Sequence, residues 1–145
     1  DQLKVMARLQ RKSSRLFNAH NITFRANASW SDTQRLYQTH DAVIILSRQE
    51  PASIALLEGM MHGLIPISSA GNGTASYLTS GLTGHIFPPG DIGALADILM
   101  KISANKLAQQ EVASNARNHA QNYLNVENFA NVWRLFDRVP KELGH

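Results

Sequence analysis

The sequence predicts an α/β fold, in which a Rossmann-like parallel sheet is flanked by helices. The first observation is the unbroken apolar, β-branched run over residues 42–46, which is typical of a parallel strand covered on both faces. The second is the alternation of predicted strands and helices through residue 90, which indicates βαβ units. The third is the length of 145 residues, which suits one compact domain over residues 1–145 with its own core.

The segments before residue 91 are predicted from hydrophobic spacing and turn residues. Ser31 with Gln34 three residues later is a capping-box pattern and predicts the start of a short helix. Pro66 cannot donate a ladder hydrogen bond, so its strand must tolerate a gap there or end near it. We expect, in chain order, a helix over 3–19, a strand over 21–26, the short helix through Thr39 and the strand over 42–46. A helix over 53–62, a strand over 64–68, a glycine-rich turn over 71–73, a short helix through Ser80 and a strand over 84–87 follow.

From residue 91 onward the chain is predicted to be helical. Asp91 is expected to cap a helix with an apolar stripe at helical spacing, formed by Leu95, Ile98, Leu99 and Ile102. A second helix is expected over 107–123. A third carries Phe129, Val132, Trp133 and Phe136 at the same spacing. We expect the three helices to cover the sheet.

Composition narrows the classes of partner. The formal net charge is +3, but the basic residues are spread out except for Arg8, Arg11, Lys12 and Arg15. A solvated helix face is the preferred interpretation of these four, with a contact to an anionic membrane surface as the alternative. Nucleic acid is not an expected partner, because the aromatic interleaving of a single-strand binder is missing. No transmembrane helix or signal peptide is visible, and the lack of cysteine fits a reducing compartment, so we expect a cytoplasmic location.

The turn over residues 47–53 holds the most polar chemistry. It follows the best predicted strand, and parallel sheets bind ligands at the carboxyl ends of their strands. Ser53 is a good N-cap residue, which leaves the amides of Ile54, Ala55 and Leu56 as donors of the first helical turn. Such a turn is a ready-made site for a phosphate or diphosphate.

Glu58 is the only formally charged residue from Pro51 through Gly90, and its predicted helix is otherwise apolar. A carboxylate in such surroundings needs hydrogen-bond donors, and two vicinal ribose hydroxyls would supply them. The alternative is that Glu58 faces solvent and that Glu50 is a loop charge. On the residues alone that alternative is preferred. The six histidines lack metal-ligand spacing, so we expect structural or surface roles for them and no metal site.

Residues 50–68 resemble the Glu-x7-Glu segment of retaining glycosyltransferases of the GT-B fold, family 4 in sequence classifications. The surrounding segments occur in the family's order and spacing, namely 21–26, 40–47, 81–91 and the helix with Phe129. The resemblance covers residues ~20 to ~137 and implies that the chain is the C-terminal, donor-binding half of a two-domain enzyme. It also implies that the fold's first strands, a basic pair and the acceptor domain lie outside this sequence, so we expect no turnover by the isolated chain.

The resemblance also implies the roles of individual residues. Glu50 would face the donor sugar as the catalytic residue, and Glu58 would hold the ribose. The base would pack at Ala26, Asn27 and Ala28, and the donor sugar and diphosphate would meet Ala52, Ser53, Ile54 and Ala55. Ala52 and Ser53 stand where many members carry a bulky residue and a glycine.

The activity that the resemblance implies is transfer of a hexose from a nucleoside-diphosphate sugar to a glycan or lipid-linked acceptor. No cofactor and no metal are implied, and the parent enzyme is expected at the inner face of the membrane. The alternative is a non-catalytic pseudo-transferase or assembly module of the same fold. A sugar-nucleotide epimerase of this fold is a more distant alternative.

Overall fold

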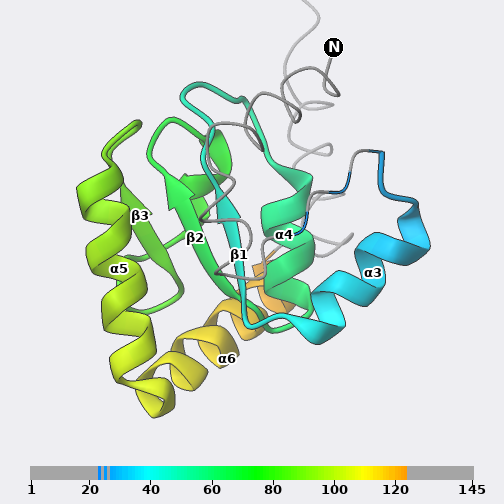
Figure 1. Ribbon diagram of the computed structural model, residues 1–145. Helices are drawn as coiled ribbons and strands as arrows, with labels where there is room; N and C mark the ends of the chain where they lie inside the picture. The colour runs from blue at the N-terminus through cyan, green and yellow to red at the C-terminus, as the bar shows by residue number, and fades with distance from the viewer. Residues whose placement is uncertain (1–22, 24, 26, 124–145) are drawn as a thin grey trace, which may run out of the picture. The chain divides into compact units, whose positions relative to one another are not determined.

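The computed structural model describes residues 23, 25 and 27–123. The chain forms two compact units, residues 1–36 and 37–145. The elements are α3 (Trp30–Thr39), β1 (Ala42–Ile45), α4 (Ile54–Met61), β2 (Ile65–Ser69), the 3-10 helix η1 (Gly73–Tyr77), β3 (His85–Phe87), α5 (Ile92–Ala104) and α6 (Lys106–Tyr123) (Figure 1).

The three strands form one parallel sheet in the order β1-β2-β3, so the predicted fold class is confirmed. Ala42 pairs with Ile65 at one end of the β1–β2 ladder, and Ser69 pairs with Phe87 at the other end of the β2–β3 ladder. Figure 1 shows the carboxyl ends of the strands at the top of the sheet and α6 below it. The loops that leave the strands therefore gather at one edge.

Pro66 lies inside the central strand, opposite Val43 of β1. The N–H of the preceding Ile65 donates toward β1, to Asp41 O at 2.9 Å. Because successive N–H groups alternate in direction, the nitrogen of Pro66 points toward β3. Pairing with β3 begins one residue later, at Ile67. The sheet therefore tolerates the missing donor at the point where its third strand has not yet started.

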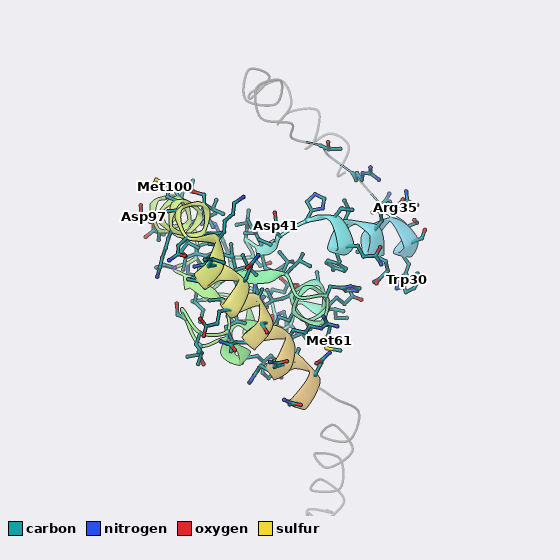
Figure 2. All side chains as sticks on the ribbon, turned by 90° about the horizontal axis from the view of Figure 1, so that it is seen from below. Trp30, Arg35, Asp41, Met61, Asp97 and Met100 are labelled. Atoms are coloured by element: carbon teal, nitrogen blue, oxygen red, sulfur yellow. The ribbon has the colours of Figure 1, made fainter. Side chains whose placement is uncertain are left out.

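The two faces of the sheet carry separate apolar clusters. Leu56 and Met60 of α4 pack with Val43 and Ile45 on one face. Phe87 and Ile67 pack with α5 on the other face. Helix α6 contributes to both clusters, through Ala116 and Ala120 to the first and Val112 to the second. Figure 2, viewed from below, shows α6 running across the underside of the sheet.

Helix α4 ends in a Schellman motif, which fixes how the chain turns into β2. Gly63 has a φ of +80°, the left-handed conformation that glycine adopts without strain. Its N–H donates to Met60 O at 3.0 Å, and the N–H of Leu64 donates to Gly59 O at 2.9 Å. These two bonds are the 5→2 and 6→1 pair of the motif. The sequence Gly63-Leu64 therefore ends the helix and starts the central strand.

Gly59 lets α4 approach β1 closely. A Cβ built on Gly59 would lie 2.4 Å from Val43 Cγ1 and 2.9 Å from Val43 Cβ. Val43 is β-branched and cannot rotate away, so the helix itself would have to move. The distance between α4 and β1 is therefore set by the lack of a side chain at residue 59.

We expect Gly59→Ala to destabilise the protein by about 1–3 kcal/mol, the usual cost of overpacking a core. The matched control is Gly93→Ala in α5, where a Cβ would meet only Asp91 Oδ1, at 3.4 Å. That variant should be unchanged or more stable by up to about 1 kcal/mol, because alanine is the better helix former. Urea unfolding of both variants measures the difference. Equal stabilities for the two would contradict the close approach of α4 to β1.

Three expectations about local structure are wrong. Helix α3 is capped by Ser29 rather than by Ser31 with Gln34: Ser29 Oγ accepts from the N–H of Asp32 at 3.1 Å and donates to Asp32 Oδ2 at 2.8 Å. The hydrogen bond from Ser29 is the largest cause that lowers the pKa of Asp32. The helix expected through Ser80 is a 3-10 helix that ends at Tyr77. Leu99 is exposed and takes no part in the clusters, unlike the other three residues of its predicted stripe.

The remaining boundaries agree with the predictions to within two residues at each helix or strand end. Asp91 caps α5 as expected, because its Oδ1 accepts from the N–H of Ala94 at 2.9 Å. The predicted helices over 3–19 and around Phe129, and the basic cluster at residues 8–15, lie outside the described residues. So does most of the predicted strand over 21–26, where Thr23 and Arg25 have irregular backbone. None of the helices within the described part of the chain has the length and apolar character needed to cross a membrane.

Candidate functional site

The loops that follow β1 and β2 are joined by hydrogen bonds beyond the carboxyl ends of the strands. The N–H of Glu50 donates to Gly71 O at 3.0 Å, and the N–H of Gly73 donates to Glu50 O at 2.9 Å. These bonds make an isolated parallel bridge between Glu50 and Asn72. The ladder between β1 and β2 therefore resumes beyond the strands and fixes the backbone of Glu50.

Gly71 and Gly73 are required for this close approach. A Cβ on Gly71 would lie 2.1 Å from Arg48 O, and one on Gly73 would lie 2.0 Å from Pro51 O. Real Cβ atoms do not come so close to backbone oxygens, so any side chain would push the loops apart. The glycine-rich turn seen in the sequence therefore acts as a platform for the loop that carries Glu50.

The carboxylate of Glu50 is half-buried and held from its own loop. Ser47 Oγ donates a hydrogen bond to Glu50 Oε2. Ser47 is itself tied to the central strand, because Ser69 Oγ donates to Ser47 O. An ionised carboxylate has about four acceptor positions, so this one hydrogen bond leaves capacity for further donors. Glu50 is thus a fixed carboxylate with room to accept hydroxyl groups.

Ser53 is the residue before α4, as predicted, and it is 4% exposed. Its side chain makes no cap hydrogen bond with the first turn of the helix. Its N–H donates instead to Thr74 Oγ1 at 3.3 Å. The Ser53 N–H is therefore already committed within the protein, although the resemblance places Ser53 among the residues that meet the donor.

The first turn of α4 keeps its donors. Because no side chain from Ser53 caps it, helix geometry leaves the N–H groups of Ile54, Ala55 and Leu56 without partners inside the helix. The side chain of Ile54 is 71% exposed, and Ala52 is exposed as well. This is the arrangement of backbone donors and positive helix end that binds phosphate groups.

Glu58 lies one turn further along α4 and is half-buried. Tyr37 Oη donates to Glu58 Oε2 at 3.0 Å, and the Tyr37 ring stacks on His62 with 5.3 Å between ring centroids. Burial is the main cause that raises the pKa of Tyr37 to about 12, and the hydrogen bond to Glu58 adds to it. Among the described residues, Tyr37 is the one whose side chain donates a hydrogen bond to the Glu58 carboxylate.

The raised pKa gives a prediction for Tyr37→Phe. The folded protein holds the phenol proton more tightly than the unfolded chain does, since the ordinary value is 10.0. Stability from this group is therefore complete below pH 10 and is lost as the pH rises through about 12. We expect the free energy of unfolding of the wild type to fall more steeply between these two pH values than that of Tyr37→Phe. Parallel curves in urea titrations at several pH values would contradict the Tyr37–Glu58 contact.

The expected base-binding residues, Ala26, Asn27 and Ala28, belong to the unit of residues 1–36, whereas Glu50 and Glu58 belong to the other unit. Ala26 lies outside the described residues. Asn27 has a φ of +52°, and both Asn27 and Ala28 are exposed. Asparagine is one of the few non-glycine residues that adopt this conformation readily.

Two features of the site have no counterpart in the sequence predictions. The sequence predictions do not include the contact of Tyr37 with Glu58, although a phenol among apolar helix positions is a signal for a buried donor. Asn72 lies in the glycine-rich turn and Thr74 follows it, and no role is predicted for either residue. Their type is informative, because Asn and Thr in a buried turn need partners for every polar atom. The structure brings both side chains against Ser53 and β2.

The histidines with described contacts have structural partners. His85 is buried, and its Nε2 lies 2.9 Å from Gln109 Oε1. Among the residues that the structure describes, no three His, Asp or Glu side chains form a group that could hold a metal ion. A cavity of about 540 Å³ lies at the opposite end of the strands, before β1 and β2 begin. It is lined by Asp41, labelled in Figure 2, and by residues around the α5–α6 junction. Its lining includes neither Glu50 nor a residue of α4.

The comparisons with known proteins give one family model and several similar solved structures. The family model described as "Glycosyl transferases group 1" matches residues 4–119. HepE from Anabaena, solved in complex with UDP-glucose, is similar with a TM-score of 0.78 and 21% identity over 91% of this chain and 36% of that one. Sucrose-phosphate synthase from Thermosynechococcus elongatus is similar with a TM-score of 0.75 and 22% identity over 92% of this chain and 35% of that one.

The C-terminal domain of the group 1 family protein LpcC from Francisella tularensis gives a TM-score of 0.73 and 17% identity over 86% of this chain and 64% of that one. A search of the curated proteins gave no significant match. The chain thus spans little more than a third of HepE and of sucrose-phosphate synthase. At these identities the structures show a common fold, which is the GT-B fold expected from the resemblance. Because the family model covers most of the sequence, the chain belongs to the glycosyltransferase group 1 family.

Proposed function

We propose that this chain is the donor-binding part of a retaining glycosyltransferase that transfers a hexose from a nucleoside-diphosphate sugar to a glycan or lipid-linked acceptor. The observation that carries the proposal is the convergence of two fixed carboxylates and one set of free backbone donors on the stretch from Glu50 to Glu58. A nucleotide sugar presents the three matching groups in order: a sugar, a diphosphate and a ribose.

The diphosphate is assigned to the first turn of α4. The N–H groups of Ile54, Ala55 and Leu56 have no partners inside the helix, and the helix dipole favours negative charge at this end. In this proposal backbone amides rather than a metal ion take up charge on the leaving diphosphate. The commitment of the Ser53 N–H to Thr74 supports Ile54 as the first contact.

The ribose is assigned to Glu58. Tyr37 occupies Oε2 of the carboxylate, and the two oxygens together have about four acceptor positions. Vicinal hydroxyls can therefore donate to Glu58 without displacing Tyr37. The phenol donor then acts as a support that keeps the carboxylate in one orientation.

Glu50 is assigned to the sugar. Its backbone is fixed by Gly71 and Gly73, and its carboxylate by Ser47. In that position it would accept the hydroxyls of the donor sugar and stabilise the positive charge that develops at the anomeric carbon. The UDP-glucose bound to HepE supports a nucleoside-diphosphate sugar as the class of donor. A chain without cysteine suits the cytoplasm, where such donors would be met.

Calorimetry with UDP, GDP, ADP and their glucose conjugates, on the protein that carries this chain, tests the proposal. We expect one of the three nucleoside diphosphates to bind, and its glucose conjugate to bind with a more favourable enthalpy. If none of the six ligands binds, the transferase proposal fails and the alternative of a non-catalytic module of the same fold is supported.

A further inference from the structure

We infer that Asn72 is a positioning residue, which aligns the loop of Glu50 and the start of α4 through a directed chain of hydrogen bonds. The inference rests on the proposed function, because it concerns how the predicted donor contacts are held. Asn72 is 2% exposed and lies between β2 and η1, so its side chain is closed off from a ligand. It therefore acts through its neighbours.

The hydrogen bonds around Asn72 run in one direction. The N–H of Ser53 donates to Thr74 Oγ1 at 3.3 Å, and Thr74 Oγ1 donates to Asn72 Oδ1 at 2.8 Å. Asn72 Nδ2 then donates to Ser68 Oγ at 3.1 Å, and Ser68 Oγ donates to Ser69 O at 3.1 Å. The first turn of α4 is thereby connected to the central strand.

The hydrogen-bond partners determine the positions of Oδ1 and Nδ2 in the side-chain amide of Asn72. The proton of Ser68 is used on Ser69 O, so Ser68 Oγ must accept and the NH₂ group of Asn72 must face it. The N–H of Thr74 can only donate, and it lies 3.2 Å from Asn72 Oδ1. The site thus needs a donor and an acceptor on one short, planar group. Asparagine meets this need, whereas aspartate lacks the donor and alanine lacks both.

The backbone of Asn72 is part of the glycine-rich turn that supports the loop of Glu50. Asn72 is the bridge partner of Glu50, and the flanking residues Gly71 and Gly73 make the two backbone hydrogen bonds to Glu50. One residue therefore fixes two groups at once: the main chain of the predicted catalytic carboxylate and the N-cap of the predicted diphosphate helix. Because misplacement of reacting groups by about 1 Å can lower a rate about 10²-fold, loss of Asn72 should affect turnover more than nucleotide binding.

The test compares Asn72→Ala with Gln109→Ala. Gln109 is 4% exposed and hydrogen-bonded to His85, so it loses a buried polar contact of the same kind at a place outside the site. We expect Asn72→Ala to lower kcat about 10- to 100-fold while the nucleotide Kd changes less than about threefold. Gln109→Ala should lower Tm and leave kcat within about twofold. A wild-type kcat in folded Asn72→Ala, or an equal loss in Gln109→Ala, would overturn the inference.

Thr74 supplies a second pair of variants in case Asn72→Ala does not fold. Thr74→Val keeps the shape but removes the hydroxyl that joins Ser53 to Asn72, whereas Thr74→Ser keeps that hydroxyl. We expect Thr74→Val to lower kcat about tenfold and Thr74→Ser to retain most of it. Equal turnover by the two variants would show that the chain of hydrogen bonds does not position the site.

Amide hydrogen exchange separates this inference from the proposed function, because it needs no substrate. In Thr74→Val the amides of Ser53 and Gly73 should exchange at least about tenfold faster than in Thr74→Ser, while the amides of β2 stay protected. If the wild type binds no nucleotide but the exchange rates differ in this way, only the functional proposal fails. If the rates are equal in the two variants, the positioning role is wrong whatever the enzyme does.

Discussion

Glu50→Gln should lower the turnover of the enzyme that carries this chain by about 10²- to 10⁴-fold, with little change in nucleotide affinity. Glutamine keeps the size of the side chain and can still accept from Ser47, so the loop should retain its shape. What is lost is the negative charge that the proposal places beside the anomeric carbon. Steady-state kinetics with the nucleotide sugar found by calorimetry measures the effect.

A matched control for this prediction is Glu111→Gln, which removes the same charge from an exposed position on α6. Its turnover should equal that of the wild type. Unchanged turnover in Glu50→Gln would remove Glu50 from its assigned role, and the carboxylate would then be a loop charge fixed by Ser47. Equal losses in both variants would point to a general effect of net charge instead.

Glu58→Ala should weaken binding of the nucleoside diphosphate about 10- to 100-fold, because each hydrogen bond to a charged group contributes about 1.5–3 kcal/mol. Tyr37→Phe is the informative companion, since it removes the protein donor to Glu58 but keeps the carboxylate. We expect its effect on affinity to be below about tenfold, reflecting a less well oriented carboxylate. Calorimetry of the two variants with the same nucleotide provides the comparison.

Unchanged nucleotide affinity in Glu58→Ala would contradict the ribose assignment. If Glu58→Ala binds nucleotide as tightly as the wild type, the carboxylate serves the fold through Tyr37 and does not meet the ribose. A 2′-deoxy nucleotide adds an independent check. It should bind the wild type more weakly but bind Glu58→Ala no more weakly than the ribonucleotide, because the variant has lost the group that meets the hydroxyl.

The order of elements could be predicted because it depends on local patterns. The run 42–46 combines β-branched residues with an absence of polar ones, and Asp91 followed by apolar residues at helical spacing leaves few alternatives to a capped helix. The cap of α3 was misplaced by two residues, because Ser29 and Ser31 both suit an N-cap and both have a polar residue three positions later. Short-range spacing alone does not choose between them.

The candidate site was predictable in its residues but not in its connections. The segment from Glu50 to Glu58 was found from strand order and from the resemblance. The bridge between Glu50 and Asn72 was not, because it depends on how closely two loops approach and on glycines with no side chain in the way. The same is true of Tyr37, whose hydroxyl meets Glu58 only once α3 and α4 have folded. Such contacts lie far apart in sequence and leave no periodic signal.

In the proposed function a nucleotide sugar binds along the stretch from Glu50 to Glu58. The most direct test is a titration of the ¹⁵N-labelled protein with UDP-glucose, GDP-glucose and ADP-glucose, followed by the shifts of its backbone amides. We predict that for one donor the largest changes occur at Ile54, Ala55 and Leu56, with smaller ones at Gly73 and none at the α5–α6 junction. Saturable binding that leaves these three amides unmoved, or that shifts the amides around Asp41 instead, would contradict the account.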